Sequence, residues 1–397
     1  MGPLAGYRVL ELGSTAAGPF CARLLADFGA EVVKIEPAEG DPIRQLGEQW
    51  EGKSLYASSI ARNKLIASID LRQQAGRDLL LRMLPQFDAV VENFRPGTLE
   101  RWGLSYEQMC EVRPNLILAR ISGYGQDGPY ASRPGYGVIG EAVSGLREMI
   151  GDPDRPPARV AVPLTDYIAG VYCAFGMTMA LLHREKTGQG QCVDTALTES
   201  AFSFMESYVP AFDKLGTMGT RTGPRLPNSA PNTLYPTADG SHIHIAAIAN
   251  SIFKRLVGAM GQEALGTDAR FRSQSARNAN EHALDQLISD WTSTRTLSEL
   301  ERTLQAVDVP ASRIFTMKDI FADPHYAARG MLCKVKDDDV GSVTLTGVVP
   351  RMSATPGEIR WAGHRIGQDT ANVLRDFAGT TEEEAAGLFD IGIAFQS

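Results

Sequence analysis

Histidine is scarce in this sequence, and its distribution is uneven. The 397 residues contain six histidines, and none of them lies within residues 1–182. No G-x-S-x-G segment is present, so neither a serine hydrolase nor a cysteine protease arrangement has its usual sequence signal. An acid or base that acts in the first part of the chain must therefore be a side chain other than histidine.

Closely spaced metal ligands are also rare. The five cysteines lie far apart without C-x-x-C spacing, which indicates reduced thiols. His242 and His244 would point the same way on a strand and could share a metal, but no third ligand with suitable spacing accompanies them. The favoured interpretation is the solvated face of a strand, and we expect no metal site.

Clustered positive charge and long apolar runs are missing as well. The formal net charge is −8 and the Lys and Arg residues are scattered, which favours a small-molecule partner over a nucleic acid or a membrane. The segment MGPLAGYRVLELG has no basic n-region, and we find no apolar run of the ~18 residues that a membrane span requires. We therefore expect a cytoplasmic protein.

The first two hundred residues alternate short β-branched runs with amphipathic stretches, which is typical of βαβ units on a parallel sheet. A long apolar helix is expected from Leu164 to His183, before the charged and glycine-containing segment REKTGQGQ. The expected strands are Tyr7 to Leu12, Glu31 to Ile35, Leu65 to Ile69, Ala89 to Glu92, Leu116 to Ile121 and Cys192 to Leu197.

The composition changes at residues 216–232, where glycine, proline and polar residues indicate a domain boundary or an active-site loop. After it, a hairpin is expected around Asp239-Gly240, followed by helices, which together suggest a smaller α+β unit. The expected helices are Ser251 to Met260, Glu281 to Trp291 and Leu297 to Ala306, and a late β segment near Val340 to Val349 precedes a helix at Thr370 to Phe377.

The stretch GYGQDG matches G-x-G-x-x-G with Gly123, Gly125 and Gly128, which could indicate a dinucleotide fold. Its context argues against that interpretation, because Pro129 follows at once and the next residues do not begin an apolar-periodic helix. A structural or substrate-lining turn is favoured.

Asp166 lies at the start of the long apolar helix, between small and aromatic residues. Taken alone, such an aspartate is more often an N-cap or first-turn residue that complements the helix dipole than a catalyst. Its role therefore depends on the segments around it.

Six ordered segments, which cover nearly the whole chain, resemble the class III CoA-transferase family of the CaiB/BaiF type. That family includes formyl-CoA transferase, crotonobetainyl-CoA transferase and the related methylacyl-CoA racemases. The segments are PLAGYRVLELGSTAAGPFCARLLADFGAEVVKIEP, RNKLIASIDL, VENFRPGTLERWGL, ISGYGQDGPYASRPGY, TDYIAGVYCAFGMTMALLHREKTGQGQCVDTAL and GHRIGQDTANVL.

The resemblance implies an α/β fold with a large Rossmann-like, CoA-binding domain formed by both ends of the chain. Residues 1–215 would be its first part and residues 326–397 would return to it. Residues 216–325 would form the smaller α+β domain between them. An interlocked homodimer is also implied.

The resemblance further implies that Asp166 is a nucleophile, which forms an aspartyl-acyl anhydride and an aspartyl-CoA thioester. A CoA thioester would be a substrate, and no tightly bound cofactor is expected. The positions that match CoA contacts in the family are Ile69, Arg72, Asn93, Phe94, Arg95 and Arg101, and Ala16 and Tyr136 would line the substrate site. An arginine that some members carry after the KIE segment is replaced here by Pro37.

Three functions remain open. The family's racemases carry a histidine where this chain has Tyr136, and racemisation needs an acid/base group on each face of the substrate, so transfer is favoured. A non-catalytic CoA-binding homologue is the remaining alternative. The expected reaction moves CoA from an acyl-CoA such as succinyl-CoA to a small carboxylic or dicarboxylic acid. Arginines suggested for a second carboxylate are Arg44, Arg62, Arg221 and Arg225.

Overall fold

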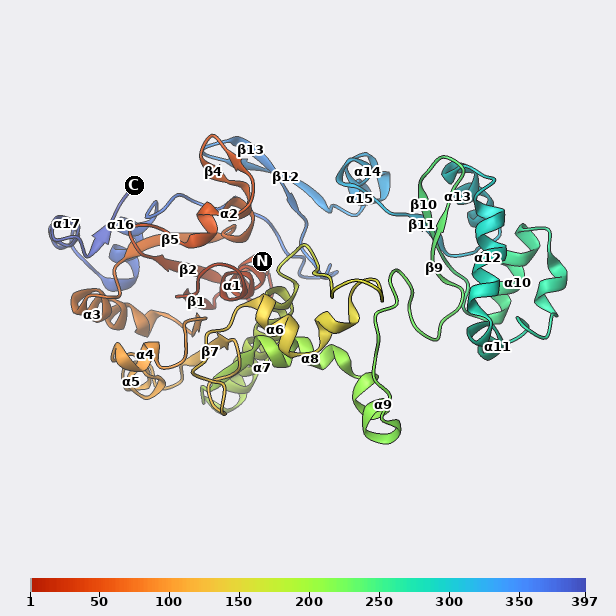
Figure 1. Cartoon of the computed structure of the whole chain (residues 1–397). Coiled ribbons are helices and arrows are strands. Elements are labelled where there is room, and N and C mark those ends of the chain that lie inside the picture. The colour runs from red at the N-terminus through yellow and green to blue at the C-terminus, as the bar shows by residue number, and fades with distance from the viewer. Residues whose placement is uncertain (1) are drawn as a thin grey trace. The chain divides into compact units, whose positions relative to one another are not determined.

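This computed structural model describes residues 2–397, whose contacts divide them into two units. Unit 1 contains the residues up to 146 together with 160–217 and 325–397, and unit 2 contains 147–159 and 218–324. The short segment 147–159, which precedes the long helix, thus belongs to the same unit as residues 218–324. Figure 1 shows the chain coloured by residue number from the N-terminus to the C-terminus.

Unit 1 is built on a seven-stranded sheet with the strand order β14-β5-β2-β1-β6-β7-β8. Every neighbouring pair is parallel except β14 with β5, so the predicted parallel sheet is confirmed. The strands are β1 (Arg8–Glu11), β2 (Glu31–Glu36), β5 (Lys64–Ile69), β6 (Ala89–Glu92), β7 (Ile117–Ser122), β8 (Cys192–Ala196) and β14 (Ala394–Phe395).

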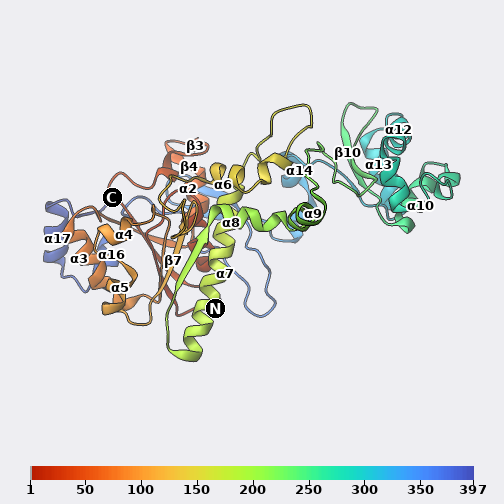
Figure 2. The ribbon, with the colours of Figure 1, turned by 60° about the horizontal axis from the view of Figure 1, so that its bottom comes forward.

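Helices cover both faces of this sheet, so its central strands are rich in buried apolar residues, although charged residues such as Lys34 and Glu92 are buried among them. Successive residues of a strand point to opposite faces, so Val9 and Leu10 of β1 belong to two different hydrophobic clusters. One cluster packs against α1 (Ala17–Asp27) and α7 (Leu164–Thr187), which runs beside β7 (Figure 2). The other packs against α3 (Gln74–Met83), α5 (Tyr106–Val112), α16 (Thr370–Val373) and α17 (Glu382–Asp390).

The other helices and strands of unit 1 are short. They are β3 (Gln49–Trp50), β4 (Lys53–Ser54), α2 (Leu55–Ile60), α4 (Thr98–Arg101), α6 (Gly137–Val143), α8 (Leu197–Phe202), α9 (Tyr208–Leu215), β12 (Leu332–Asp337) and β13 (Gly341–Thr346). The end of the chain returns to the sheet, where Asp369 accepts a 2.7 Å hydrogen bond from the Ile66 amide and Ala394 pairs with Ile69.

Unit 2 is an α+β unit with a three-stranded antiparallel sheet in the order β11-β10-β9. The predicted hairpin around Asp239-Gly240 is present, and Gly240 adopts the positive φ of +75° that its turn requires. Its elements are β9 (Asn232–Pro236), β10 (His242–Ala246), β11 (Ala311–Arg313), α10 (Asn250–Ala259), α11 (Gln274–Ala279), α12 (Glu281–Thr292), α13 (Leu297–Ala306) and α14 (Met317–Ala322), and α15 (Pro324–Ala328) follows at the return to unit 1. The predicted fold class is confirmed.

The long helix α7 ends four residues later than predicted, at Thr187, because Gly188 with φ +74° is its C-cap. By length and composition α7 is apolar enough to span a membrane, whereas the sequence analysis found no apolar run that is long enough. Its inner face, including Ala169, Cys173 and Met177, is part of the core of unit 1. A core helix meets the same criterion, so the finding is weak evidence for a membrane span.

A buried ion pair joins the carboxyl ends of β6 and β7. Glu92 Oε1 accepts a 2.7 Å hydrogen bond from Arg120 Nε, and Glu92 Oε2 accepts one of 2.6 Å from the Phe94 amide. Arg120 also pairs with Glu100 at 2.7 Å. Burial raises the pKa of Glu92 to about 7, although Arg120 opposes the shift. Glu92 therefore binds its proton more tightly in the folded chain than in the unfolded one.

The substitution Glu92→Gln should change how stability depends on pH. Between the unfolded pKa of ~4.3 and the folded value, the folded wild type holds the extra proton, so its free energy of unfolding falls as pH rises. From about pH 5.5 to about pH 8 the wild type should lose ~2 kcal/mol more than Glu92→Gln. Urea unfolding at both pH values measures this. The control Glu100→Gln removes the other partner of Arg120 and should keep the loss; equal losses in wild type and Glu92→Gln would contradict the assignment.

Candidate functional site

Two adjoining pockets lie where the chain leaves the carboxyl ends of β1 and β6. The crossovers from these neighbouring strands run in opposite directions, which opens a crevice between the loops that follow them. The Ile69 pocket has a volume of about 300 Å³ and the Asp166 pocket one of about 280 Å³. Ser14 and Phe94 line both, so the two pockets adjoin within unit 1, and we refer to them together as the groove.

Most of the residues singled out in the sequence lie along this groove. Those at the Ile69 pocket are Ile69, Arg72 and Phe94, and those at the Asp166 pocket are Ala16, Asn93, Phe94, Arg95, Tyr136 and Asp166. Arg101 lines neither pocket, and its Nη2 donates to Thr98 Oγ1 at 2.9 Å. Trp102, its neighbour, lines the Ile69 pocket and packs edge-on against Phe94 with ring centroids 5.3 Å apart. Sequence reasoning missed Trp102, although it follows Arg101 directly.

Asp166 lies in the first turn of α7, as expected for an acidic residue at a helix start, and it also lines a pocket. The neighbouring turn of α6 comes very close, because a Cβ placed on Gly137 would lie 1.9 Å from Asp166 Oδ2. No residue with a side chain fits at position 137 unless the carboxylate moves. The absence of a side chain at Gly137 therefore leaves the space that the Asp166 carboxylate occupies.

The loop after β1, which lines both pockets, is held by side chains from three other segments. Asn93 Oδ1 accepts from the Ser14 amide at 2.7 Å, and Asn93 Nδ2 donates to the Ser14 carbonyl at 2.9 Å. Asp41 Oδ1 accepts from the amide of Thr15, which has a positive φ of 66°. Lys34 Nζ donates to the Gly13 carbonyl at 2.6 Å. The loop thus keeps a conformation that its own residue types do not favour.

Beneath the loop lies a buried network of charges. Lys34 pairs with Glu11 at 2.9 Å and with Asp41 at 2.7 Å, and Lys64 pairs with Glu11 at 2.6 Å. Burial opposes the charge of Lys34, but Glu11, Asp41 and Glu36 outweigh it and raise the lysine's pKa. Burial lowers the pKa of Lys64 to about 8 despite Glu11. Lys34 is therefore the lysine that keeps its charge as the pH rises.

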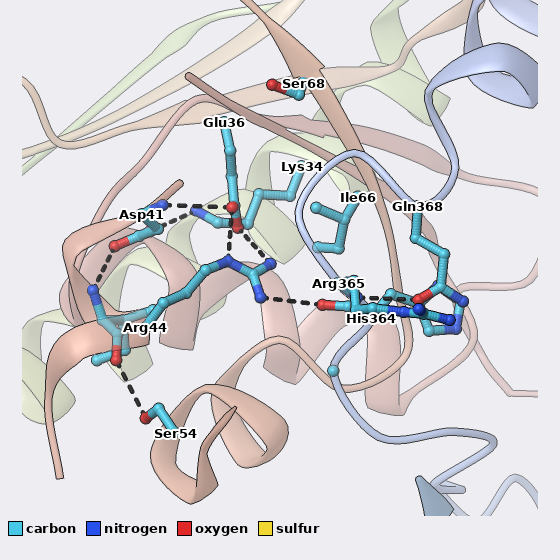
Figure 3. Close-up of polar contacts among 12 residues, drawn as sticks. Lys34, Glu36, Asp41, Arg44, Ser54, Ile66, Ser68, His364, Arg365 and Gln368 are labelled. Atoms are coloured by element: carbon cyan, nitrogen blue, oxygen red, sulfur yellow. Dashed lines mark hydrogen bonds and ion pairs between the residues drawn. The ribbon is translucent and has the colours of Figure 1, made fainter. Parts of the chain in front are cut away.

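Arg44 extends this network to the end of the chain. Figure 3 shows its guanidinium between Glu36, which it binds at 2.7 Å, and the carbonyl of His364, at 3.0 Å. Arg62 is fully buried and pairs with Asp27 at 2.6 Å. Neither arginine lines the Asp166 pocket, so the suggestion that they bind a substrate carboxylate is not supported.

The two other suggested arginines, Arg221 and Arg225, belong to unit 2, where they pair with Glu148 and Asp285. The arginines that do line the Asp166 pocket are Arg95 and Arg133. Arg95 donates to the carbonyl of Ser132, and the guanidinium carbon of Arg133 lies 3.5 Å from the centre of the Tyr130 ring. Since Arg133 stands in the RPG segment beside Tyr136, a search for arginines near the family segments would have found it.

The glycines of GYGQDG have two structural roles: Gly125 and Gly128 adopt positive φ angles of 92° and 82°, and Gly123 allows close packing. A Cβ on Gly123, which lines the Asp166 pocket, would lie 2.8 Å from the Cα of Gly135. No helix begins directly after the segment, since the next one, α6, starts at Gly137. This geometry fits the favoured interpretation, a structural and pocket-lining turn.

Within residues 2–397, no group of three or more His, Cys, Asp or Glu side chains has an arrangement that could hold a metal ion, and this includes the surroundings of the paired histidines of β10. His244 Nε2 instead lies 2.8 Å from Asn232 Oδ1. Along the described groove, no histidine lines either pocket. Among the residues that line the described Asp166 pocket, Asp166 supplies the carboxylate available for acyl chemistry.

Comparisons with known proteins agree with this geometry. The sequence profile described as CoA-transferase family III matches residues 4–370. "Succinyl-CoA--D-citramalate CoA-transferase" of Chloroflexus aurantiacus is 46% identical over 388 residues, which are 97% of this chain and 96% of that protein. "Succinate--glutarate CoA-transferase" of Agrobacterium fabrum is 33% identical over 383 residues, with 94% and 95% covered.

A solved structure supports the same assignment. The crystal structure of a CAIB/BAIF family protein from Brucella suis superposes with a TM-score of 0.84 at 32% identity, covering 95% of this chain and 99% of that one. Profile, relatives and structure agree over nearly the full length, so the resemblance inferred from the six segments is confirmed. The chain belongs to CoA-transferase family III and is a class III CoA-transferase.

Proposed function

We propose that this enzyme transfers CoA from succinyl-CoA to a small dicarboxylic acid. The two relatives described above are named for citramalate and glutarate, both dicarboxylates, and for succinyl-CoA or succinate. The observation that carries the proposal is the composition of the Asp166 pocket, where one carboxylate lies with two arginines, Arg95 and Arg133. An acid that has one carboxylate at the reacting carbon and a second one nearby matches that arrangement.

CoA would lie along the groove. The adenine ring suits the apolar part of the Ile69 pocket, between Ile69 and the aromatic pair Phe94 and Trp102. Arg72, at the rim, supplies a cation for phosphate. The pantetheine chain would then pass Ser14 and Phe94, which line both pockets, and bring the thioester to Asp166.

Asp166 would act as the nucleophile. Its carboxylate oxygen attacks the succinyl thioester carbonyl, the C–S bond breaks, and a mixed anhydride and CoA thiolate form. The thiolate attacks the Asp166 carbonyl of the anhydride, which releases succinate and leaves an aspartyl-CoA thioester. The acceptor carboxylate then attacks this thioester, which releases CoA thiolate and forms a second mixed anhydride between Asp166 and the acceptor. The thiolate attacks the acceptor's acyl carbon of this anhydride, and the acceptor's CoA thioester forms. The Asp166 carboxylate is regenerated, and no net proton is taken up or released.

The pocket fits racemisation less well. Inverting the carbon next to a thioester requires an acid/base group on each face. Among the residues lining the described Asp166 pocket, Asp166 is the one carboxylate, and no histidine or lysine accompanies it. Tyr136, which stands at the position of the racemase histidine, is 71% exposed. Transfer needs a single nucleophile and matches the pocket as it stands.

A homodimer accompanies this proposal. Along the outer face of α7, large apolar side chains including Val171, Phe175 and Leu182 are exposed, with Phe175 at 59%. They border a separate apolar pocket of about 830 Å³, which is lined by α1, α7 and residues between 331 and 352. An exposed apolar patch of this kind is typical of a protein interface. A second copy of the chain is the partner that the family resemblance implies.

Asp166→Asn should abolish CoA transfer while CoA still binds. Wild type and variant are incubated with succinyl-CoA and citramalate, glutarate, malate, mesaconate or itaconate, with acetate as a monocarboxylate comparison, and CoA esters are measured by mass spectrometry. Hydroxylamine added during turnover should label Asp166 in the wild type. Transfer by Asp166→Asn at the wild-type rate would exclude the nucleophile. Epimerisation of a 2-methylacyl-CoA without exchange would instead indicate a racemase, and inactivity with all acids a binding protein.

Gly137→Ala should lower kcat by ~100-fold or more, because the added Cβ would displace the carboxylate of Asp166 and misplaced nucleophiles react slowly. Steady-state kinetics with succinyl-CoA provide the measurement. Gly387→Ala is a matched control in unit 1, since a Cβ there meets nothing within 4 Å. An active Gly137→Ala enzyme would mean that the Asp166 position is not critical.

Arg133→Gln should raise KM for the dicarboxylate acceptor about 10-fold or more, the effect expected for a lost charge-assisted hydrogen bond. The KM for succinyl-CoA should change less if Arg133 reads the acceptor alone. Arg375→Gln, which removes an exposed arginine paired with its neighbour Asp376, serves as the control. Unchanged acceptor KM in Arg133→Gln would remove Arg133 from the acceptor site.

A further inference from the structure

Arg72 is held by two carboxylates of different character. Asp70 binds the guanidinium through two atoms, with Arg72 Nε to Oδ1 at 2.8 Å and Nη2 to Oδ2 at 3.2 Å. Glu39 binds the remaining nitrogen, Nη1, at 2.9 Å. The side chains of Arg72 and Glu39 are 59% and 60% exposed, so solvent reaches this second pair.

The two carboxylates differ in what else they do. Asp70 is buried and also accepts hydrogen bonds from the Arg72 amide and from Gln73 Nε2, so it is fixed in place. Glu39 makes no further hydrogen bond or ion pair in the described part of the chain, residues 2–397. Asp70 therefore orients the arginine, and Glu39 can leave it.

The Ile69 pocket has few cations to offer a phosphate. Its charged lining residues are the acids Glu36, Glu39, Asp41 and Asp70 and the cations Lys34 and Arg72. Lys34 is buried and committed to Glu11 and Asp41. Arg72 is thus the pocket's one solvent-facing cation among the described residues, and its outward nitrogen is occupied by Glu39.

We propose that Glu39 is a displaceable counter-ion that occupies Arg72 in the free enzyme and gives way to a phosphate group of CoA. The inference rests on the proposed function, in which CoA lies along this groove. An exposed ion pair is weak, and a phosphate carries more charge and more acceptor oxygens than a carboxylate, so the exchange is favourable. Glu39 thereby lowers the affinity for CoA. Pro37, which replaces an arginine of some family members, has no charge and supplies no second cation for the phosphate.

The test is calorimetric titration with CoA and with 3′-dephospho-CoA. Glu39→Gln should bind CoA ~3- to 10-fold more tightly than the wild type, because Arg72 no longer has a competing carboxylate. Added salt should reduce the gain. A gain for CoA alone identifies the 3′-phosphate as the displacing group, and an equal gain for both ligands identifies the diphosphate.

Two further variants make the result decisive. Glu31→Gln, which breaks an exposed Arg–Glu pair of 2.8 Å away from the groove, should leave CoA affinity unchanged. In Arg72→Gln, adding Glu39→Gln should give no gain. Unchanged affinity in Glu39→Gln, or a gain that persists without Arg72, overturns the proposal. The transfer assay is separate: a wild type that binds CoA in this way but transfers nothing would overturn the proposed function alone.

Discussion

The shape of the groove depends on one buried ammonium group. Lys34 Nζ bonds the Gly13 carbonyl and pairs with Glu11 and Asp41, and Asp41 in turn holds the amide of Thr15. These contacts fix the loop that lines both pockets. A charge this deep is costly unless it is fully paired, and the acids around Lys34 provide that pairing. The cluster thereby fixes the backbone at Gly13 and Thr15, next to the residues of this loop that line the two pockets.

Much of the sheet could be predicted, because its central strands are buried on both faces and therefore appear in the sequence as short runs rich in Val, Ile, Leu and Ala. The boundaries of β6 agree with the expectation residue for residue. The short strand β14 and the helix α17 were missed for the same physical reason. Strand β14 has two residues, which are too few to show a periodicity. Helix α17 begins with three glutamates, so its first turn gives little apolar signal. Their place is set by packing at the sheet edge rather than by local pattern.

The site was only partly predictable. Asp166 and the loop residues were identified through the family segments, and most of them lie along one groove. Their supports were not found, because Lys34 and Lys64 look like ordinary strand residues until the fold brings Glu11 between them. The arginines illustrate the same limit. Arg44 and Arg62 looked available, yet both are engaged in ion pairs, while Arg133 lines the pocket.

No histidine lines the two described pockets, and Gly137 approaches Asp166 closely; both observations fit the proposed transfer through Asp166. A transferase that works through an anhydride needs a carboxylate that is ionised and fixed, and it needs no second base at the substrate's α-carbon. Gly137 leaves just enough room for the Asp166 carboxylate and none for another side chain between them. Because the Ile69 pocket adjoins the pocket that contains this carboxylate, a CoA thioester bound as proposed would have its acyl group beside Asp166. In the proposed binding mode, Arg72 would bind a phosphate of CoA and Arg133 the second carboxylate of the acid.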